Sequence, residues 1–355
     1  MLLMSLDCRP HHRTLPRLAA GACVLLTFLT AFLLHTAPAR AVSIGTWNLA
    51  EQHDVRVAGL LHDLPDGGFH GERPLAGTEL RDALGALATT LGVPRIPAIP
   101  DGSVSVAGFD RLLAGQLGVA DTAAQVQHEL WKAGLDPAPA LGFEVVARAL
   151  GLRDNHPANQ ERFELYPTQA ITRAEAAHSL AVAIRWKGTA AQWAQDYFTN
   201  FLLPDDTSAQ RQVLRLAIAK IGMPYIWGGE TDTASAYFGG QVHGGYDCSG
   251  FVWRVFKLGH LTWGAQIHGR TAAQQAAEIP KQQRIRLDDV HPADLVFFGP
   301  GRFWQRATER RIVHEGIALS PDWMVHSSGQ GVYISQLRLD PWRARRFSWA
   351  RRVLP

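Results

Sequence analysis

Three residues in the C-terminal half of this 355-residue chain have the types that nucleophilic catalysis uses: Cys248, His314 and His326. The other two cysteines lie within the first 41 residues, which have the features of an export leader. A single thiol left in an exported chain has no internal disulfide partner, so it is inert, intermolecular or reactive. The two downstream histidines favour the reactive interpretation.

The residues around Cys248 fit an activated thiol. A cysteine attacks as its thiolate, and an ordinary thiol with a pKa of about 8.5 is only slightly ionised at neutral pH. We expect Asp247, or the residues just before it, to cap a helix whose positive end stabilises the thiolate. A His314 imidazolium could pair with that thiolate. Ser249 and Gly250 are small, so a bound substrate carbonyl can approach the backbone N–H of Cys248 as an oxyanion donor.

The two histidines are predicted to lie on adjacent antiparallel strands. A strand over residues 314–319 would place His314 with Gly316 and Ala318 on one face. A turn at residues 320–322 would then bring His326 beside His314, where it can orient that ring. Two alternatives stay open at this point. Cys248 could be an inert buried residue, or one cysteine and two histidines could bind zinc, although the chain has no close-spaced ligand pair.

Residues 1–41 are predicted to be a secretory signal peptide. Arginines precede an apolar run over residues 18–34, and residues 39–41 offer a small-residue cleavage site. An uncleaved anchor is the alternative, because the run is just short of a span of about 20 residues. No later stretch could span a bilayer.

The charge of the chain is concentrated in that leader. The formal net charge is +3, and without the leader the remaining chain is near neutral, which argues against a nucleic-acid partner. Two arginine-rich runs, over residues 302–311 and 343–352, are interpreted as solvated faces. The alternative for these runs is attraction to an anionic polymer.

Residues 42–203 are predicted to form a helical, repeat-like domain. Apolar residues recur at helical spacing in several segments, and Thr78 and Thr172 are predicted N-caps. Acidic residues recur at intervals of about one repeat, one in each of four predicted helices: Glu79, Asp110, Glu144 and Glu175. Repeats of this kind must pack together to bury their apolar faces. The alternative is a helical bundle with no ligand of its own.

Residues 204–355 follow a different pattern, helices first and short strands later. A helix is predicted over residues 208–221 and a second one after Cys248. Strands are predicted over residues 295–298, 312–319, 323–326, 332–334 and 347–353. This order predicts an α+β domain with an antiparallel sheet.

Several motifs in this second part, taken together, resemble the NlpC family of cell-wall peptidases. They follow in the order of that family over about residues 208–353: residues 222–229, 247–251, 270–275, 292–298, 314–317 and 325–328. Separately, residues 66–75 and 171–175 resemble S-layer homology repeats, a family that binds cell-wall polymers.

The resemblance to the NlpC family implies a papain-like α+β fold and cleavage of peptidoglycan stem peptides, commonly between D-glutamate and a diamino acid. It implies Cys248 as the nucleophile, His314 as the general base and His326 as the orienting residue. Tyr225 would lie near the oxyanion site, and Asp247 would support the turn of the nucleophile. Neither a metal nor an organic cofactor is implied.

The expected protein is therefore exported to the cell envelope or beyond it and acts on peptidoglycan. Residues 42–203 would hold a secondary wall polymer. The rival interpretations are an amidase of the same fold that cuts between glycan and peptide, and a wall-binding protein whose site is degenerate.

Three features depart from the family pattern. Glu315 stands where an apolar residue is usual, on a face predicted to be buried, so we expect a neighbouring arginine to pair with it. Ala318 replaces a position that is often aromatic. Residues 230–246 form a long glycine-containing loop that either borders the substrate cleft or is a tolerated insertion, and its His243 is predicted to be at the surface.

Overall fold

The structure is a computed structural model that describes residues 47–96, 99, 101–235 and 240–355. The predicted leader and its alternative as an anchor lie outside the described residues. Among the residues described, no helix is both long and apolar enough to cross a membrane. Residues 44–355 cluster as one compact unit. A separate domain over residues 42–203 therefore stays a prediction.

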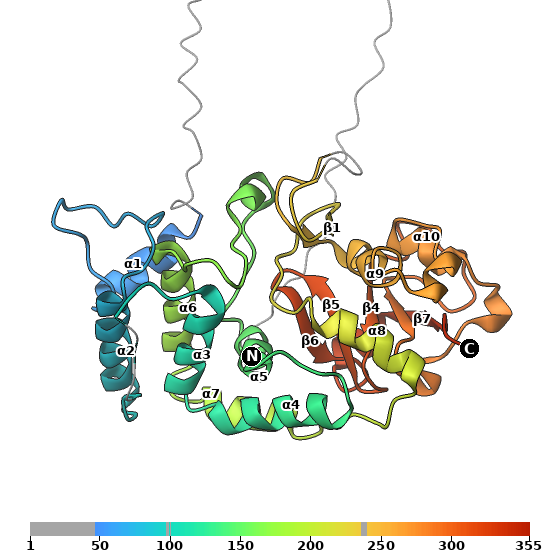
Figure 1. Ribbon diagram of the computed structural model, residues 1–355, viewed down its shortest axis with the longest axis horizontal. Coiled ribbons are helices and arrows are strands. Elements are labelled where there is room, and N and C mark those ends of the chain that lie inside the picture. Colours follow the sequence, from blue (N-terminus) through green and yellow to red (C-terminus); the bar gives the residue numbers. More distant parts are fainter. Residues whose placement is uncertain (1–46, 97–98, 100, 236–239) are drawn as a thin grey trace, which may run out of the picture. The chain divides into compact units, whose positions relative to one another are not determined.

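The first part of the described chain contains helices and connecting loops (Figure 1). These elements are α1 (Leu49–Val57), α2 (Gly77–Leu91), α3 (Val106–Gln116), α4 (Ala120–Lys132), α5 (Leu141–Ala149), the 3₁₀ turn η1 (Ala158–Phe163), α6 (Arg173–Arg185) and α7 (Ala190–Phe198). The residues at helical spacing are buried, as in Leu80, Leu84 and Leu87 of α2.

The two predicted helix caps in this part have different outcomes. Thr172 caps α6, because its side chain accepts the backbone N–H of Glu175. The prediction for Thr78 is wrong: Ala76 is the N-cap of α2, and Thr78 lies inside the first turn. Glu79 causes this earlier start, since its carboxylate accepts the backbone N–H of Ala76 at 2.9 Å.

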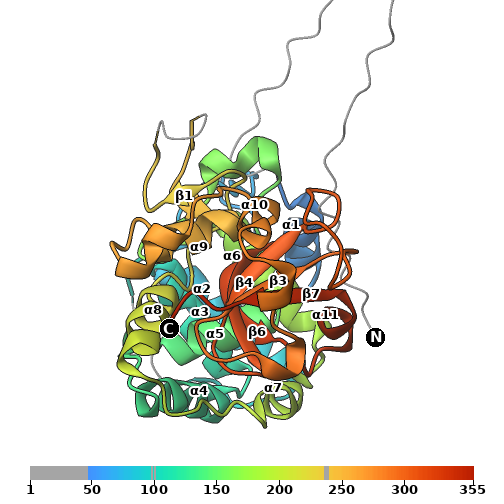
Figure 2. The same cartoon turned by 90° about the vertical axis from the view of Figure 1, so that its right-hand side faces the viewer.

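The second part begins with α8 (Ser208–Ile218) and contains a five-stranded antiparallel sheet (Figures 1 and 2). The strand order is β6-β5-β4-β3-β7. The strands are β3 (Leu295–Phe298), β4 (His314–Ala318), β5 (Trp323–Ser328), β6 (Gly331–Gln336) and β7 (Phe347–Arg351), and a separate pair is formed by β1 (Glu230–Thr231) and β2 (Gly245–Tyr246). The α+β prediction for this part is confirmed.

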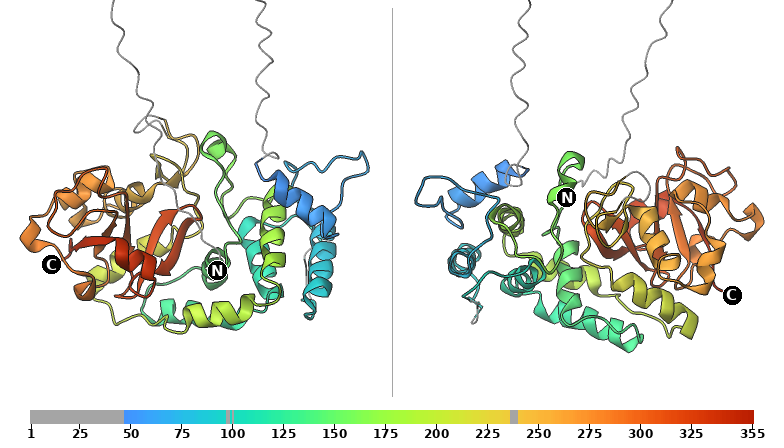
Figure 3. Two further views of the ribbon diagram at one scale, coloured as in Figure 1. Left: turned by 180° about the vertical axis from the view of Figure 1, so that it is seen from behind. Right: turned by 45° about the horizontal axis from the view of Figure 1, so that its top comes forward.

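Further helices connect these strands. They are α9 (Cys248–Phe256), η3 (Thr262–Gln266), α10 (Ala272–Ala277), η4 (Lys281–Gln283), η5 (Leu287–Asp289) and α11 (Pro341–Arg346). Figure 3 shows the same arrangement from two further directions.

The two faces of the sheet pack against different residues. Phe251 and Val255 of α9 belong to the same buried apolar cluster as Ile317 of β4, and this cluster continues into the helices of the first part. Ala318 and Met324 belong to a smaller cluster. Alternation along β4 and β5 explains the division, because successive side chains point to opposite faces. The sheet thus holds α9, which begins at the cysteine, against its strands.

Candidate active site

Cys248 is the first residue of α9, and the turn before it is closely held. Asp247 is the N-cap: its carboxylate accepts the backbone N–H of Gly250 at 2.5 Å, as predicted. The Oγ of Ser249 donates to the same carboxylate at 3.1 Å. Cys248 itself is half-buried. The position at a helix N-terminus favours a negative charge on the sulfur, because the first backbone N–H groups point toward it.

Arg270 is the centre of a second set of contacts behind this turn. Its guanidinium pairs with Asp247 at 3.0 Å and with Glu230 at 2.7 Å, and it also donates to the carbonyl of Gly228 at 2.8 Å. A side chain at Gly250 would overlap the carbonyl oxygen of Gly229, 1.8 Å from the added carbon. The glycine therefore lets residues 228–229 lie directly against the first turn of α9.

His314 and His326 lie side by side on β4 and β5, as the strand and turn prediction required. His314 Nε2 and His326 Nδ1 are 2.8 Å apart. His326 Nε2 is 2.9 Å from the Oγ of Ser335 on β6, so the three side chains form one line of hydrogen bonds. His326 is 1% exposed, whereas His314 is half-buried.

Burial dominates the pKa values of the two histidines. Burial, and then the positive charge of Arg343, lower the pKa of His314 below its usual value. Burial also lowers the pKa of His326, and a positive charge on His314 would add to this effect. A lowered pKa favours a neutral His314 ring, and the imidazolium–thiolate pair stays a prediction.

Two observations connect the cysteine turn with the histidine strands. Ser327, next to His326, donates from its Oγ to the carbonyl of Tyr246 at 2.6 Å, two residues before Cys248. Glu315, next to His314, lies within electrostatic reach of Asp247, whose negative charge helps to raise its pKa. Helix α9 also contacts β4 and β5. The backbone segments that carry the three predicted catalytic residues therefore meet.

The other predicted site residues lie around the same turn. The backbone N–H of Tyr225 donates to Asn155 at 3.3 Å, a contact that no sequence pattern indicated. The Oγ of Ser249 accepts from Arg270 at 3.0 Å in addition to its bond with Asp247, so its hydroxyl supports the turn. The oxyanion role of Tyr225 and the substrate-binding roles of Asp247 and Ser249 stay predictions.

Sequence reasoning missed three residues of this site. Ser335, Arg270 and Glu230 were assigned no role. Arg270 opens one of the quoted motifs, so the resemblance contained a signal for it. Ser335 meets His326 because β5 and β6 pair, and Glu230 meets Arg270 because distant parts of the chain fold together. A single sequence does not reveal either contact.

Glu315 is buried as predicted, but no arginine of the described residues forms a hydrogen bond with it. The residue is 0% exposed, and neither carboxylate oxygen has a hydrogen-bond partner among the described residues. Burial, and then the negative charge of Asp247, raise the pKa of Glu315 well above its usual value, although Arg270 opposes them. The raised pKa favours the protonated carboxyl, which needs no arginine to balance a buried charge.

The loop over residues 230–246 is ordered around Gln241 in its described part. Gln241 accepts the backbone N–H of Glu230 at 2.8 Å and donates to the carbonyl of Gly245 at 3.0 Å. The surface prediction for His243 is wrong: the residue is buried and its ring stacks on Tyr166 at 4.2 Å. The first part of the chain provides this cover, 77 residues before His243 in the sequence.

No group of three or more histidine, cysteine or acidic side chains is placed to hold a metal ion within the part of the chain that the structure describes. The line His314–His326–Ser335 uses both nitrogens of His326 in hydrogen bonds. The zinc alternative therefore has no ligand cluster in this part.

Comparisons with known proteins find similarity in the second part of the chain. Residues 222–351 match the model of the NlpC/P60 family. The murein DD-endopeptidase/murein LD-carboxypeptidase MepS of Escherichia coli is 35% identical over 117 residues, 33% of this chain and 54% of that protein. The bifunctional muramidase/DL-endopeptidase CwlT of Bacillus subtilis is 31% identical over 139 residues, 39% of this chain and 35% of that protein.

A solved structure also matches this part, the NlpC/p60 domain of the peptidoglycan hydrolase SagA. It is 22% identical, covers 40% of this chain and 97% of the solved chain, and has a TM-score of 0.29. The chain spans less than two thirds of the length of the curated relatives it matches. The family match over residues 222–351 and the names of these relatives support the predicted resemblance to cell-wall peptidases. The S-layer homology of residues 42–203 stays a prediction.

Proposed function

We propose that this chain is an exported peptidoglycan hydrolase that cleaves stem-peptide amide bonds of the D-glutamyl–diamino acid type. The observation that carries the proposal is that Cys248 begins α9, the helix that contacts the strands of His314 and His326. The family match and the names of the relatives, which refer to murein and to endopeptidases, support this substrate class.

The proposed reaction begins with His314 as a neutral base. Its Nε2 is engaged with His326, so Nδ1 is the atom that takes the proton from the Cys248 sulfur. The thiolate then attacks the carbonyl carbon and forms a C–S bond, and the backbone N–H of Cys248 stabilises the oxyanion. His314 returns the proton to the leaving amine as the C–N bond breaks, which leaves a thioester. Water then hydrolyses the thioester, with His314 again as the base.

His326 and Ser335 would serve this base by fixing its orientation. His326 occupies the third place of a catalytic triad, and Ser335 holds its other nitrogen. Proton transfer from Cys248 leaves a thiolate, whose negative charge stabilises the protonated His314 until the proton passes to the leaving amine.

The N-terminal helices are proposed to bind a secondary wall polymer, but the last repeat offers little for such contact. Arg173 is 1% exposed, pairs with Glu79 and donates to the carbonyl of Phe69. Glu175 is buried and pairs with Arg153 at 2.9 Å. A polymer would therefore have to bind other residues of this region. The test measures how much full-length Cys248→Ala is retained on sacculi with and without secondary polymer. Equal retention on both would refute polymer binding.

The peptidase proposal is tested with purified sacculi, wild-type protein and Cys248→Ala, with mass analysis of the released fragments. We expect wild type to release fragments with a new amino group on the diamino acid and a free D-glutamyl carboxyl, and Cys248→Ala to release none. Free lactyl ends on the amino sugar would instead identify the amidase. Fragments in equal amounts from Cys248→Ala, or none from either protein, would refute the proposed mechanism.

A further inference from the structure

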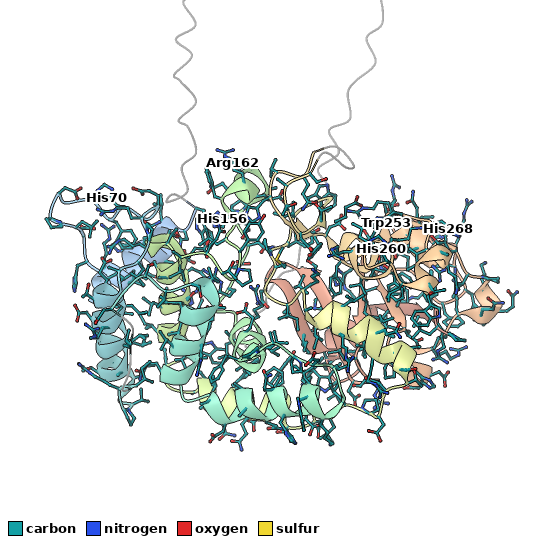
Figure 4. All side chains as sticks on the ribbon, in the orientation of Figure 1. His70, His156, Arg162, Trp253, His260 and His268 are labelled. Atoms are coloured by element: carbon teal, nitrogen blue, oxygen red, sulfur yellow. The ribbon has the colours of Figure 1, made fainter. Side chains whose placement is uncertain are left out.

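The connection between α5 and α6, residues 150–172, lies along the peptidase motif that begins at Gly222. Figure 4 labels two of its residues, His156 and Arg162, between the helices and the loop that contains β1. This connection lies outside residues 222–351, which match the family model. Any contribution it makes to catalysis is therefore a property of this chain that the family match does not supply.

Asn155 holds two separate segments of the peptidase part. Its side-chain oxygen accepts the backbone N–H of Tyr225 at 3.3 Å, and its side-chain nitrogen is 3.4 Å from the Tyr225 carbonyl. The same nitrogen is 3.4 Å from the carbonyl of Ser328, and the backbone N–H of Asn155 donates to Gly329 at 2.8 Å. One residue thus bridges the Tyr225 motif and the segment that follows His326.

Glu161 and Tyr166 extend this contact along the motif and the loop. Glu161 accepts the backbone N–H of Trp227 at 3.0 Å. Tyr166 accepts the backbone N–H of Gly244 at 3.0 Å through its hydroxyl and stacks on His243. The connection therefore contacts both the motif over residues 222–229 and the loop over residues 230–246, which together lead to the nucleophile turn.

Arg148, at the end of α5, holds the same two peptidase segments from within the core. It is 4% exposed, donates to the carbonyls of Gly222 and Gln330, and is neutralised by Glu144 at 2.7 Å. The close approach requires a small residue at position 331, where an added side-chain carbon would lie 2.8 Å from the Arg148 guanidinium. Because the Arg148 guanidinium is charged and buried, its hydrogen bonds to the carbonyls of Gly222 and Gln330 are strong and hold both segments in place.

We propose that the α5–α6 connection is a positioning part of the peptidase active site: Asn155 and Glu161 hold the backbones of Tyr225 and Trp227, and Asn155 holds the segment that follows His326. The helices of the first part would then be required for turnover and not only for attachment. This proposal rests on the proposed peptidase function. It assigns no contact with substrate to Asn155 or Glu161, so both are positioning residues.

The test uses the full-length protein with Asn155→Ala, Glu161→Ala and Glu161→Gln, and Asn159→Ala as the matched control from the exposed face of η1. Glutamine keeps an oxygen that can accept the Trp227 N–H, so Glu161→Gln should restore what Glu161→Ala loses. We expect Asn155→Ala and Glu161→Ala to lower kcat roughly tenfold with KM changed less than about twofold, since small misplacements of reacting groups are costly. Alkylation of Cys248 gives the number of active sites, and kcat is calculated per active site. A smaller folded fraction therefore does not appear as a lower kcat.

A second measurement does not depend on hydrolysis. The ring signals of His314 and His326 in nuclear magnetic resonance spectra should shift in Asn155→Ala and stay unchanged in Asn159→Ala. Unchanged kcat per active site together with unchanged ring signals would overturn the proposal. Failure of Glu161→Gln to restore kcat would also overturn it for Glu161. If wild type hydrolyses no wall peptide, the peptidase function fails, and the ring signals alone decide whether Asn155 positions His326.

Discussion

Replacing Glu315 by glutamine should stabilise the protein by an amount that grows with pH. The side chain is 0% exposed, and its carboxylate oxygens have no hydrogen-bond partner among the described residues. Its raised pKa means that the folded protein holds the proton to a higher pH than the unfolded chain, which releases it near the ordinary value of 4.5. Folding therefore takes up a proton above that pH, and stability falls as the pH rises.

The expected size follows from this proton uptake. While Glu315 stays protonated in the folded state, each pH unit above the unfolded value costs about 1.4 kcal/mol. Between pH 5 and pH 7 the cost rises by about 2.7 kcal/mol. Glutamine has nearly the shape of the protonated acid and cannot titrate. The stabilities of wild type and Glu315→Gln should thus agree within about 1 kcal/mol near pH 4.5 and separate steadily above it.

The assay is urea denaturation of both proteins at half-unit pH steps from 4.5 to 7.5. Titrations shared by the two proteins cancel in the difference between their unfolding free energies. Glu309→Gln is the control, because an exposed carboxylate loses little hydration on folding. A difference for Glu315→Gln that does not change with pH would show that Glu315 is ionised when folded, and it would refute the reasoning.

Three further predictions concern the site and its support. Ser335→Ala should lower kcat roughly tenfold with little change in KM, because His326 loses its second hydrogen bond; steady-state kinetics with unchanged kcat would contradict this role. Asp247→Ala should cost about 1–2 kcal/mol in urea denaturation through loss of the helix cap, and an unchanged midpoint would count against it. Glu175→Gln should cost about 3 kcal/mol because it leaves Arg153 buried with a weaker partner, and a loss below about 1 kcal/mol would argue against a tight pair.

Local features of the chain were predicted from sequence where neighbouring residues decide them. Asp247 caps α9, and the turn at residues 320–322 returns the chain so that His326 meets His314. The strand over residues 295–298 was predicted with its observed bounds. In each case the determining groups lie within a few residues of one another, so side-chain type and spacing are sufficient.

The incorrect predictions for Glu315 and His243 share a different physical cause. The sequence indicated that Glu315 is buried, because alternation along a strand is local. The sequence could not show that, among the described residues, the carboxyl has no arginine partner. One candidate, Arg270, pairs with Glu230 instead, and this choice depends on the tertiary fold. His243 likewise has the composition of a surface loop, yet Tyr166 covers it.

Residue type and spacing were thus enough to find the groups on which the proposed chemistry rests: a cysteine at a helix start, two histidines on paired strands, and the motifs around them. Which residues support these groups depends on the fold. Asn155 and Tyr225 are 70 residues apart, and Ser335 reaches His326 only across a strand pair. Contacts at such separation depend on how the whole chain packs, and no short pattern encodes them.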